Sequence, residues 1–297
     1  MHAQSANRVP GFGKLIQEHR SAASCRPLAY WLTCSLAAYN RIVLTALQTS
    51  IIRFDSVGST NTEAARQAVE GAAEGLCIVA SEQTAGRGRF DRHWLSPKGA
   101  GLYLSIVLRP QMDQNTWPLS TLMASLAVHD ALLDACNLQT DIKWPNDILA
   151  NDRKLCGILG EMVDTPFGRA VVVGIGINLN PEGFPPELHQ TATSVQAATG
   201  KPPDAEVVLQ ALLRALERRY ERLQCAGGRE EIVREWSARS SYASGKRVRI
   251  ANGDETLKGI TRGLESDGAL RLETDAGEVR IVRAGDVASV RSSADGG

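Results

Sequence analysis

Apolar and polar residues alternate with clear periodicity from residue 51 onward, in a pattern that mixes strands with helices. Residues 51–54 predict a short strand, the continuous apolar run 76–80 predicts a buried strand, and residues 102–108 predict a third. Between the first two, Ser59-Thr60-Asn61 is typical of a helix N-terminus, and Glu63 places an acidic side chain in the first turn. The N-terminal half of this region therefore predicts strand, helix, strand and strand.

The middle of the chain continues the mixture. Residues 115–136 predict the longest central helix, with an apolar stripe suited to a core. Strands are predicted at 140–144, 155–162 and 170–177, and the turn-rich residues between the last two indicate a hairpin. Hairpins together with helices predict a mixed sheet and an α+β fold class.

The composition of the chain changes again toward its C-terminus. Helices are predicted at 204–225 and 230–239, and from residue 245 short alternating runs are separated by turn signals such as Asn252-Gly253. That spacing predicts a small all-β barrel of roughly 50 residues. We place a domain boundary near Ser240. The predicted parts are an N-terminal extension at 1–50, a main domain at 51–240 and a C-terminal domain at 241–293.

Charge and composition limit the possible partners. The chain has 297 residues with 33 basic and 33 acidic side chains, which argues against a general nucleic-acid binder but allows a local anion site. The apolar stretch 31–47 is interrupted by Asn40 and Arg41, so it is shorter than the ~18 apolar residues of a spanning helix. No C-x-x-C pair occurs among the six cysteines. We expect a cytoplasmic protein without a membrane partner.

The strongest chemical signal is a run of glycine and arginine that follows the second strand. It contains Gly86-Arg87-Gly88-Arg89, with Arg92 and Trp94 shortly after. Glycine lets the backbone approach a ligand, and arginine forks match phosphate and carboxylate oxygens. The run predicts a loop that closes over an anionic ligand. It is not a P-loop, because no Gly-Lys-Ser/Thr follows, and Asp91 stands where a dinucleotide fingerprint needs its third glycine.

Two further signals follow in the main domain. The run Lys143-Trp144-Pro145-Asn146-Asp147 predicts a strand that ends in a turn, where Asp147 could hold Mg²⁺ on a nucleotide. An ordinary Pro-Asn-Asp turn explains this run equally well. Lys154 begins an apolar strand, so its ammonium could point into a pocket, although a surface lysine at a strand end explains it too.

Over about residues 51–290 the chain closely resembles the biotin–protein ligase family. The resemblance lies in the order of the motifs: Ser59-Thr60-Asn61, then Gly86–Arg92, then Lys143–Asp147, then Arg153–Glu161 with Gly174–Asn178. The resemblance implies a catalytic domain like that of class II aminoacyl-tRNA synthetases, followed by an SH3-like C-terminal domain. It implies that biotin and ATP, with Mg²⁺, form biotinyl-5′-AMP, and that biotin then passes to one lysine of a biotin carboxyl carrier protein, such as that of acetyl-CoA carboxylase.

The resemblance also implies roles for particular residues. Arg89 and Lys154 would be catalytic, and Asp147 would be the metal ligand. The biotin-binding residues would be Ser59, Thr60, Asn61, Gln83, Arg87, Gly88, Arg89 and Lys154. The nucleotide-binding residues would be Arg87, Arg89, Trp94, Asn146, Asp147, Gly176 and Asn178.

Two departures and two alternatives accompany this resemblance. Many family members have glycine where Asp91 stands, and residues 1–50 lack a recognisable helix-turn-helix, so we expect a ligase that does not bind DNA. A homodimer is compatible with the family. One alternative is a lipoate or octanoyl ligase or transferase of the same fold. The other is a non-enzymatic sensor of biotinyl-adenylate, against which the missing DNA-reading domain counts.

Overall fold

The computed structural model describes residues 47–252 and 255–289, which form one compact unit. Its centre is a seven-stranded mixed sheet in the order β1-β2-β3-β7-β6-β5-β4, in which only the β1–β2 pair is parallel. The mixed sheet and the α+β class agree with the sequence prediction. The strands are β1 (Ser50–Phe54), β2 (Leu76–Ala80), β3 (Gly101–Leu108), β4 (Asp141–Lys143), β5 (Asp147–Ala150), β6 (Arg153–Thr165) and β7 (Gly168–Asn178).

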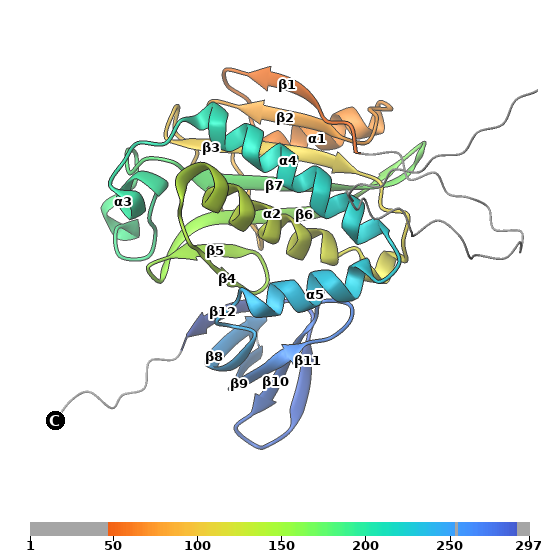
Figure 1. The fold of residues 1–297 in the computed structure, drawn as a ribbon, viewed down its shortest axis with the longest axis vertical. Coiled ribbons are helices and arrows are strands. Elements are labelled where there is room, and N and C mark those ends of the chain that lie inside the picture. The colour runs from red at the N-terminus through yellow and green to blue at the C-terminus, as the bar shows by residue number, and fades with distance from the viewer. Residues whose placement is uncertain (1–46, 253–254, 290–297) are drawn as a thin grey trace, which may run out of the picture. The chain divides into compact units, whose positions relative to one another are not determined.

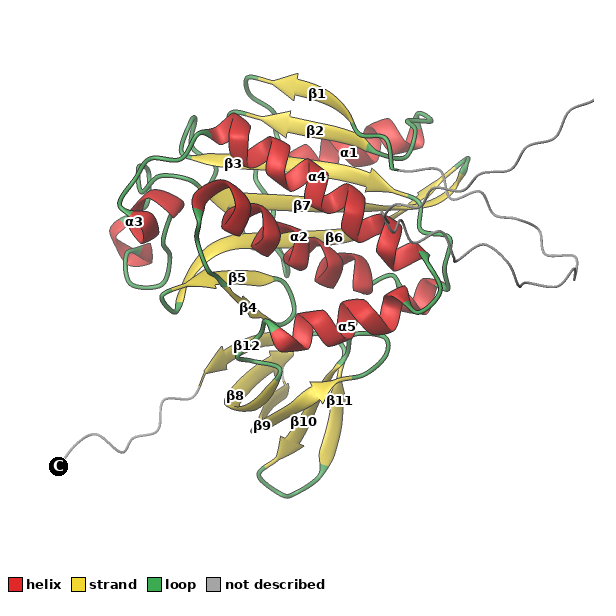
Figure 2. Ribbon diagram, viewed as in Figure 1, coloured by secondary structure: helices red, strands yellow, loops and turns green. Residues whose placement is uncertain are grey.

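Helices cover the two faces of this sheet unequally (Figures 1 and 2). On one face α2 and α4 build the large core with the inward side chains of the strands. On the other face α1 packs through Ala64 and Ala68 against β2, β3 and β7, and the rest of that face is left for the site. The helices are α1 (Thr60–Val69), α2 (Leu119–Cys136), α3 (Val195–Thr199), α4 (Ala205–Gln224) and α5 (Gly228–Ala238).

The predicted longest helix needs correction. Residues 114–116 form a separate 3₁₀ turn, and α2 begins only at Leu119, so α4 with 20 residues exceeds α2 with 18. The region Gln114–Cys136 is apolar and long enough, by composition, to cross a membrane, but 67% of its most apolar stretch is buried inside the protein. Its apolar character is explained by packing between the sheet and α4, where helices are hydrophobic on most sides.

A second sheet follows α5 (Figure 1). It has five strands in the order β11-β10-β9-β8-β12, all paired antiparallel, and Val248, Ile250, Leu270 and Leu272 join its interior to the large core. The alternating runs 248–250, 270–272 and 279–281 predict three of these strands, β8, β10 and β11, whereas β9 and β12 were not predicted. The strands are β8 (Ser244–Asn252), β9 (Glu255–Leu264), β10 (Leu270–Thr274), β11 (Val279–Val282) and β12 (Asp286–Ser289).

Candidate active site

Three glycines make a hollow in the sheet beside α1. Gly157 of β6 pairs with Gly176 of β7, and Gly174 lies two residues before Gly176, so all three are on the same face. A Cβ on Gly174 would lie 1.9 Å from Asn61 Oδ1, and one on Gly176 would lie 2.4 Å from Trp94 Nε1. The glycines are therefore required for close approach: they let Asn61 and the Trp94 ring lie directly on the sheet.

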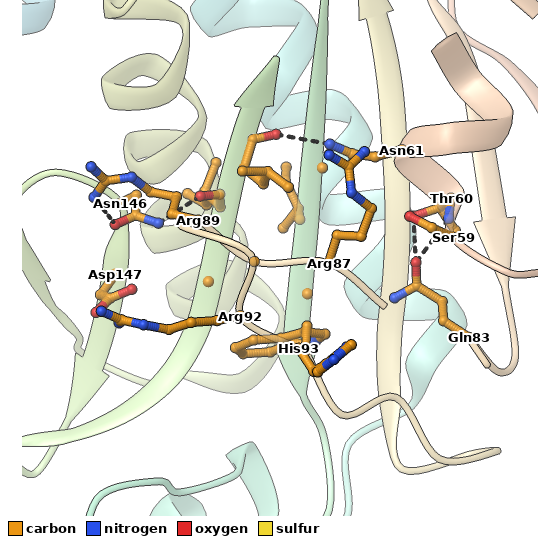
Figure 3. A pocket seen from close by; sticks show the side chains of 18 of the residues that line it. Ser59, Thr60, Asn61, Gln83, Arg87, Arg89, Arg92, His93, Asn146 and Asp147 are labelled. Carbon is orange, nitrogen blue, oxygen red and sulfur yellow. Dashed lines mark hydrogen bonds between the residues drawn. The ribbon is translucent and has the colours of Figure 1, made fainter. Parts of the chain in front are cut away.

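Polar side chains from the start of α1 close one end of this hollow (Figure 3). The Thr60 amide and hydroxyl both donate to Gln83 Oε1, at 2.8 and 3.0 Å. Asn61 Oδ1 accepts from the hydroxyl of Ser105, at 2.6 Å, and Asn61 Nδ2 donates to Glu161 Oε2 at 2.8 Å. Thr60, Asn61 and Ser105 are buried and the set is mutually bonded, so it presents donors and acceptors in fixed positions to a ligand.

The loop of residues 86–94, here called the Gly-Arg loop, crosses the open side of the hollow. Arg87 forms a two-armed ion pair with Glu161, at 2.6 and 3.2 Å, and Arg89 Nη1 donates to Asn146 Oδ1 at 3.3 Å (Figure 3). Burial lowers the pKa of Arg89, while the carboxylate of Asp147 opposes that shift. A half-buried guanidinium beside a pocket is a strong binding group for a ligand anion, because little water screens it.

The tip of the loop has an unusual backbone. Phe90 and Asp91 both adopt left-handed conformations, with φ of 55° and 56°. This region costs little for glycine and more for residues with a side chain, among which aspartate is better tolerated than bulky residues. The loop therefore needs positive φ at residue 91, a conformation that glycine would adopt at less cost than Asp91.

We expect the backbone at residue 91 to control how readily the loop forms. Asp91→Gly should stabilise the ordered loop by about 0.5–1 kcal/mol, and Asp91→Val should destabilise it by about 1–2 kcal/mol, because a β-branched residue resists positive φ. Hydrogen exchange of the loop amides measures the difference. Equal protection in both variants would mean that the loop does not hold this conformation in solution.

Lys154 and Asp147 lie at the other end of the hollow. Lys154 Nζ is 2.7 Å from Asp147 Oδ1 and 5.3 Å from the centre of the Trp94 ring, and Lys143 Nζ is 3.4 Å from Asp147 Oδ2. The contact of Lys154 with Asp147 is an ion pair by distance, without hydrogen-bond alignment. The turn predicted at Asp147 is in fact the start of β5, which places this carboxylate between two ammonium groups.

A larger cavity adjoins the hollow and shares Trp94 with it. It has a volume of about 540 Å³, compared with about 130 Å³ for the hollow under the loop. Trp94, Asp147 and Lys154 line both spaces, so a ligand in one would meet a ligand in the other at these side chains. The size and the mixed lining suit a nucleotide-sized ligand.

The fold brings nearly all the predicted site residues to one pocket. Every predicted site residue except Asn178 lines the hollow, and Asn178 lines the larger cavity, where its Nδ2 donates to Thr193 O at 3.0 Å. The sequence analysis assigned no site role to Ser105, which lies on β3, or to Glu161, which ends the motif run 153–161 on β6. It also missed several residues of the segment 184–192 and the β12 residues Val287 and Ala288, which line the larger cavity.

Together these features define a ligand site under an arginine-rich loop, on a mixed sheet that is followed in the chain by a second β-sheet domain. Residues 54–178 match the biotin/lipoate A/B protein ligase family, and residues 243–288 match the biotin protein ligase C-terminal domain. The chain belongs to this family, as the resemblance in the sequence had indicated.

Curated and solved relatives agree with this assignment. The chain is 42% identical over 241 residues to the bifunctional ligase/repressor BirA of Bacillus subtilis, covering 79% of this chain and 72% of the relative. It is 36% identical to the biotin–[acetyl-CoA-carboxylase] ligase of Mycobacterium tuberculosis, covering 79% and 86%. A biotin protein ligase from Aquifex aeolicus, solved with biotin and ATP, has a TM-score of 0.71 at 29% identity, covering 82% and 99%.

Proposed function

We propose that this protein is a biotin–protein ligase that activates biotin with ATP and transfers it to a lysine of a carboxylase carrier domain. The observation that carries the proposal is the pair of adjoining cavities with Arg89 at the first, and with Lys154 and Trp94 at both. Relatives whose names give this activity match most of the chain. The substrates in those names supply the candidates, and the shape and charge of the site support them.

Biotin would occupy the hollow and the nucleotide the larger cavity. The bonded set of Thr60, Asn61 and Gln83, with Ser59 beside it, would meet the polar ureido ring, and the substrate carboxylate would then point toward Lys154. Arg87 and Gly88 would cover the bound biotin on the open side of the hollow. Gly176 and Asn146 would border the adenylate, while Asn178 would face the nucleoside.

The chain's own residues would mainly neutralise charge. In the first step a biotin carboxylate oxygen attacks the α-phosphorus, and the bond to pyrophosphate breaks. Two anions meet in this step, so the cations of Arg89 and Lys154 lower its barrier. In the second step the acceptor lysine amine attacks the acyl carbon and AMP leaves. No protein nucleophile is required.

The described residues do not fit a resident metal ion. Both oxygens of Asp147 face ammonium groups, and the described part of the chain has no cluster of three His, Cys, Asp or Glu side chains. Mg²⁺ keeps octahedral geometry and usually binds through substrate phosphates. We therefore propose that Mg²⁺ arrives as the ATP complex, and that Asp147 becomes a ligand only if Lys143 and Lys154 turn toward the phosphates.

A transfer assay tests the function. The chain is incubated with labelled biotin, ATP, Mg²⁺ and a purified biotin carboxyl carrier domain, and transfer of label to the carrier lysine is expected. A carrier domain with that lysine replaced by arginine is the control. Transfer of lipoate or octanoate to its own carrier, without transfer of biotin, would instead favour the alternative within the same family.

We expect Arg89→Ala to release the acyl-adenylate into solution. Arg89 lies on a loop whose residues belong to neither hydrophobic core cluster, so the change should leave the fold intact while weakening retention by about tenfold. Free biotinyl-adenylate in the filtrate, measured per pyrophosphate formed, is the readout. Retention equal to that of the unchanged protein, at an equal unfolding temperature, would contradict the role given to Arg89.

Several broader features belong to the same proposal. We infer that the large domain, at 51–240, is related to class II aminoacyl-tRNA synthetases, and that the domain at 241–293 is SH3-like. A cytoplasmic location and a homodimer are proposed with them. The expected lack of DNA binding depends on residues 1–50, most of which lie outside the described residues. A gel shift with biotin-operon operator DNA at moderate salt tests it, and a specific complex would contradict it.

A further inference from the structure

The small β-sheet domain reaches the Gly-Arg loop at one turn, between β11 and β12. Asp286 at the start of β12 forms an ion pair with Arg92, and the carbonyl oxygen of Gly285 accepts a hydrogen bond from Arg89 Nη1 at 3.2 Å. Asp286 also lines the hollow under the loop. Two loop arginines are thus attached to a domain that lies almost 200 residues away in the sequence.

The charges of the loop explain why such an attachment is useful. Arg89 is partly buried, and its Nη1 donates hydrogen bonds to the neutral oxygens of Asn146 and Gly285. Arg92 carries a second positive charge close enough to lower the pKa of Arg89. The carboxylate of Asp147 offsets part of the positive charge of Arg89, but without a counter-charge of its own Arg92 would repel Arg89 whenever the loop lay over an empty pocket. Asp286 supplies that counter-charge from outside the loop.

We propose that Asp286 is a positioning residue, which holds the loop over the acyl-adenylate by pairing with Arg92. The identity of the retained intermediate rests on the proposed ligase function. The attachment of the loop to the small β-sheet domain does not depend on that function. Asp286 acts through Arg92 and is not assigned contact with the reacting atoms. The C-terminal domain then has a defined task in the reaction: it keeps a labile anhydride away from water.

The expected effect is moderate, because the pair is partly open to solvent. The side chain of Arg92 is 64% exposed and that of Asp286 is 31% exposed. Exposed pairs shift an equilibrium only slightly and are screened by salt, so loss of the pair should raise the open fraction of the loop about two- to fivefold. The hydrogen bond from Arg89 to Gly285 remains in the variant and prevents complete opening.

The test compares Asp286→Asn with the conservative Asp286→Glu. Asp275→Asn is the matched control, because Asp275 lies in the same domain and pairs with Arg247 at 2.8 Å, away from both cavities. The first readout is the rate of tryptic cleavage after the loop arginines in the full chain without substrates. The second is the amount of free biotinyl-adenylate released per pyrophosphate formed, at low and at high salt.

Asp286→Asn should raise both readouts about two- to fivefold over the unchanged protein at low salt and by less at high salt. Asp286→Glu and Asp275→Asn should stay near the unchanged protein. Equal cleavage and equal release in Asp286→Asn and the unchanged protein would overturn the proposal. Faster cleavage of Asp286→Asn, with no adenylate formed even by the unchanged protein, would leave the attachment standing and contradict the ligase function. A rise in Asp275→Asn equal to that in Asp286→Asn would show general loosening of the domain and overturn it.

Discussion

Replacement of Lys154 by alanine is expected to slow formation of the acyl-adenylate by about 10²–10³-fold, the cost of removing one preorganised charge from a developing anion. Lys154 lines both cavities, with its Nζ held between Asp147 and the Trp94 ring. The loss should appear in the rate of pyrophosphate release and leave the unfolding temperature nearly unchanged.

The controls for Lys154 separate charge from local structure. Lys98→Ala removes a lysine that pairs with Asp55 on the surface, and it should leave the rate unchanged. Lys154→Arg keeps a cation but changes its shape, so partial activity is expected. A rate for Lys154→Ala within about threefold of the unchanged protein would mean that Lys143 or Arg89 supplies the decisive charge, because a preorganised charge contributes far more than that.

The second large effect is expected from Gly176→Ala. The added Cβ would lie 2.4 Å from Trp94 Nε1, so the indole must leave its place on the sheet and enter one of the cavities. Overpacking of this kind costs about 1–3 kcal/mol. We expect the KM for biotin to rise about 10–100-fold, since each 1.4 kcal/mol corresponds to a factor of about ten. Steady-state kinetics at saturating ATP measure the change.

The geometry also suggests a control and a rescue for Gly176. A Cβ added at Gly58 would have no atom within 4 Å, so Gly58→Ala should bind biotin normally. Trp94→Phe provides a smaller ring that leaves room for the added Cβ. Gly176→Ala should therefore raise the KM for biotin by less in the Trp94→Phe protein than in the unchanged protein. A normal KM in Gly176→Ala would show that Trp94 does not lie on the sheet when substrate binds.

Most strands and helices of the main domain followed from local patterning, although β5 and α3 were not predicted. The buried run at β2 and the hairpin of β6 and β7 carried clear apolar and turn signals, and both are present. The errors have local causes. Asp147 looked like part of a turn because Pro-Asn-Asp is common in turns, whereas pairing with Gly157 makes it the first residue of β5.

The same contrast holds for the site. Its motif residues can be recognised in the sequence because charged side chains occur in an unusual local context: arginines among glycines, and a lysine at the start of an apolar strand. Neither Ser105 nor Glu161 was assigned a role in the site, because each is a single polar residue on a strand whose partners depend on the sheet register.

By itself, the sequence determined the loop chemistry, the order of the motifs and the mixture of strands and helices, because these depend on residue type and short spacing. Only the tertiary structure decided that three glycines from two strands form one floor, that Asp147 is enclosed by two lysines, and that Asp286 reaches the loop. Such contacts join residues far apart in the chain, and strand register and domain packing, which no local pattern encodes, bring them together.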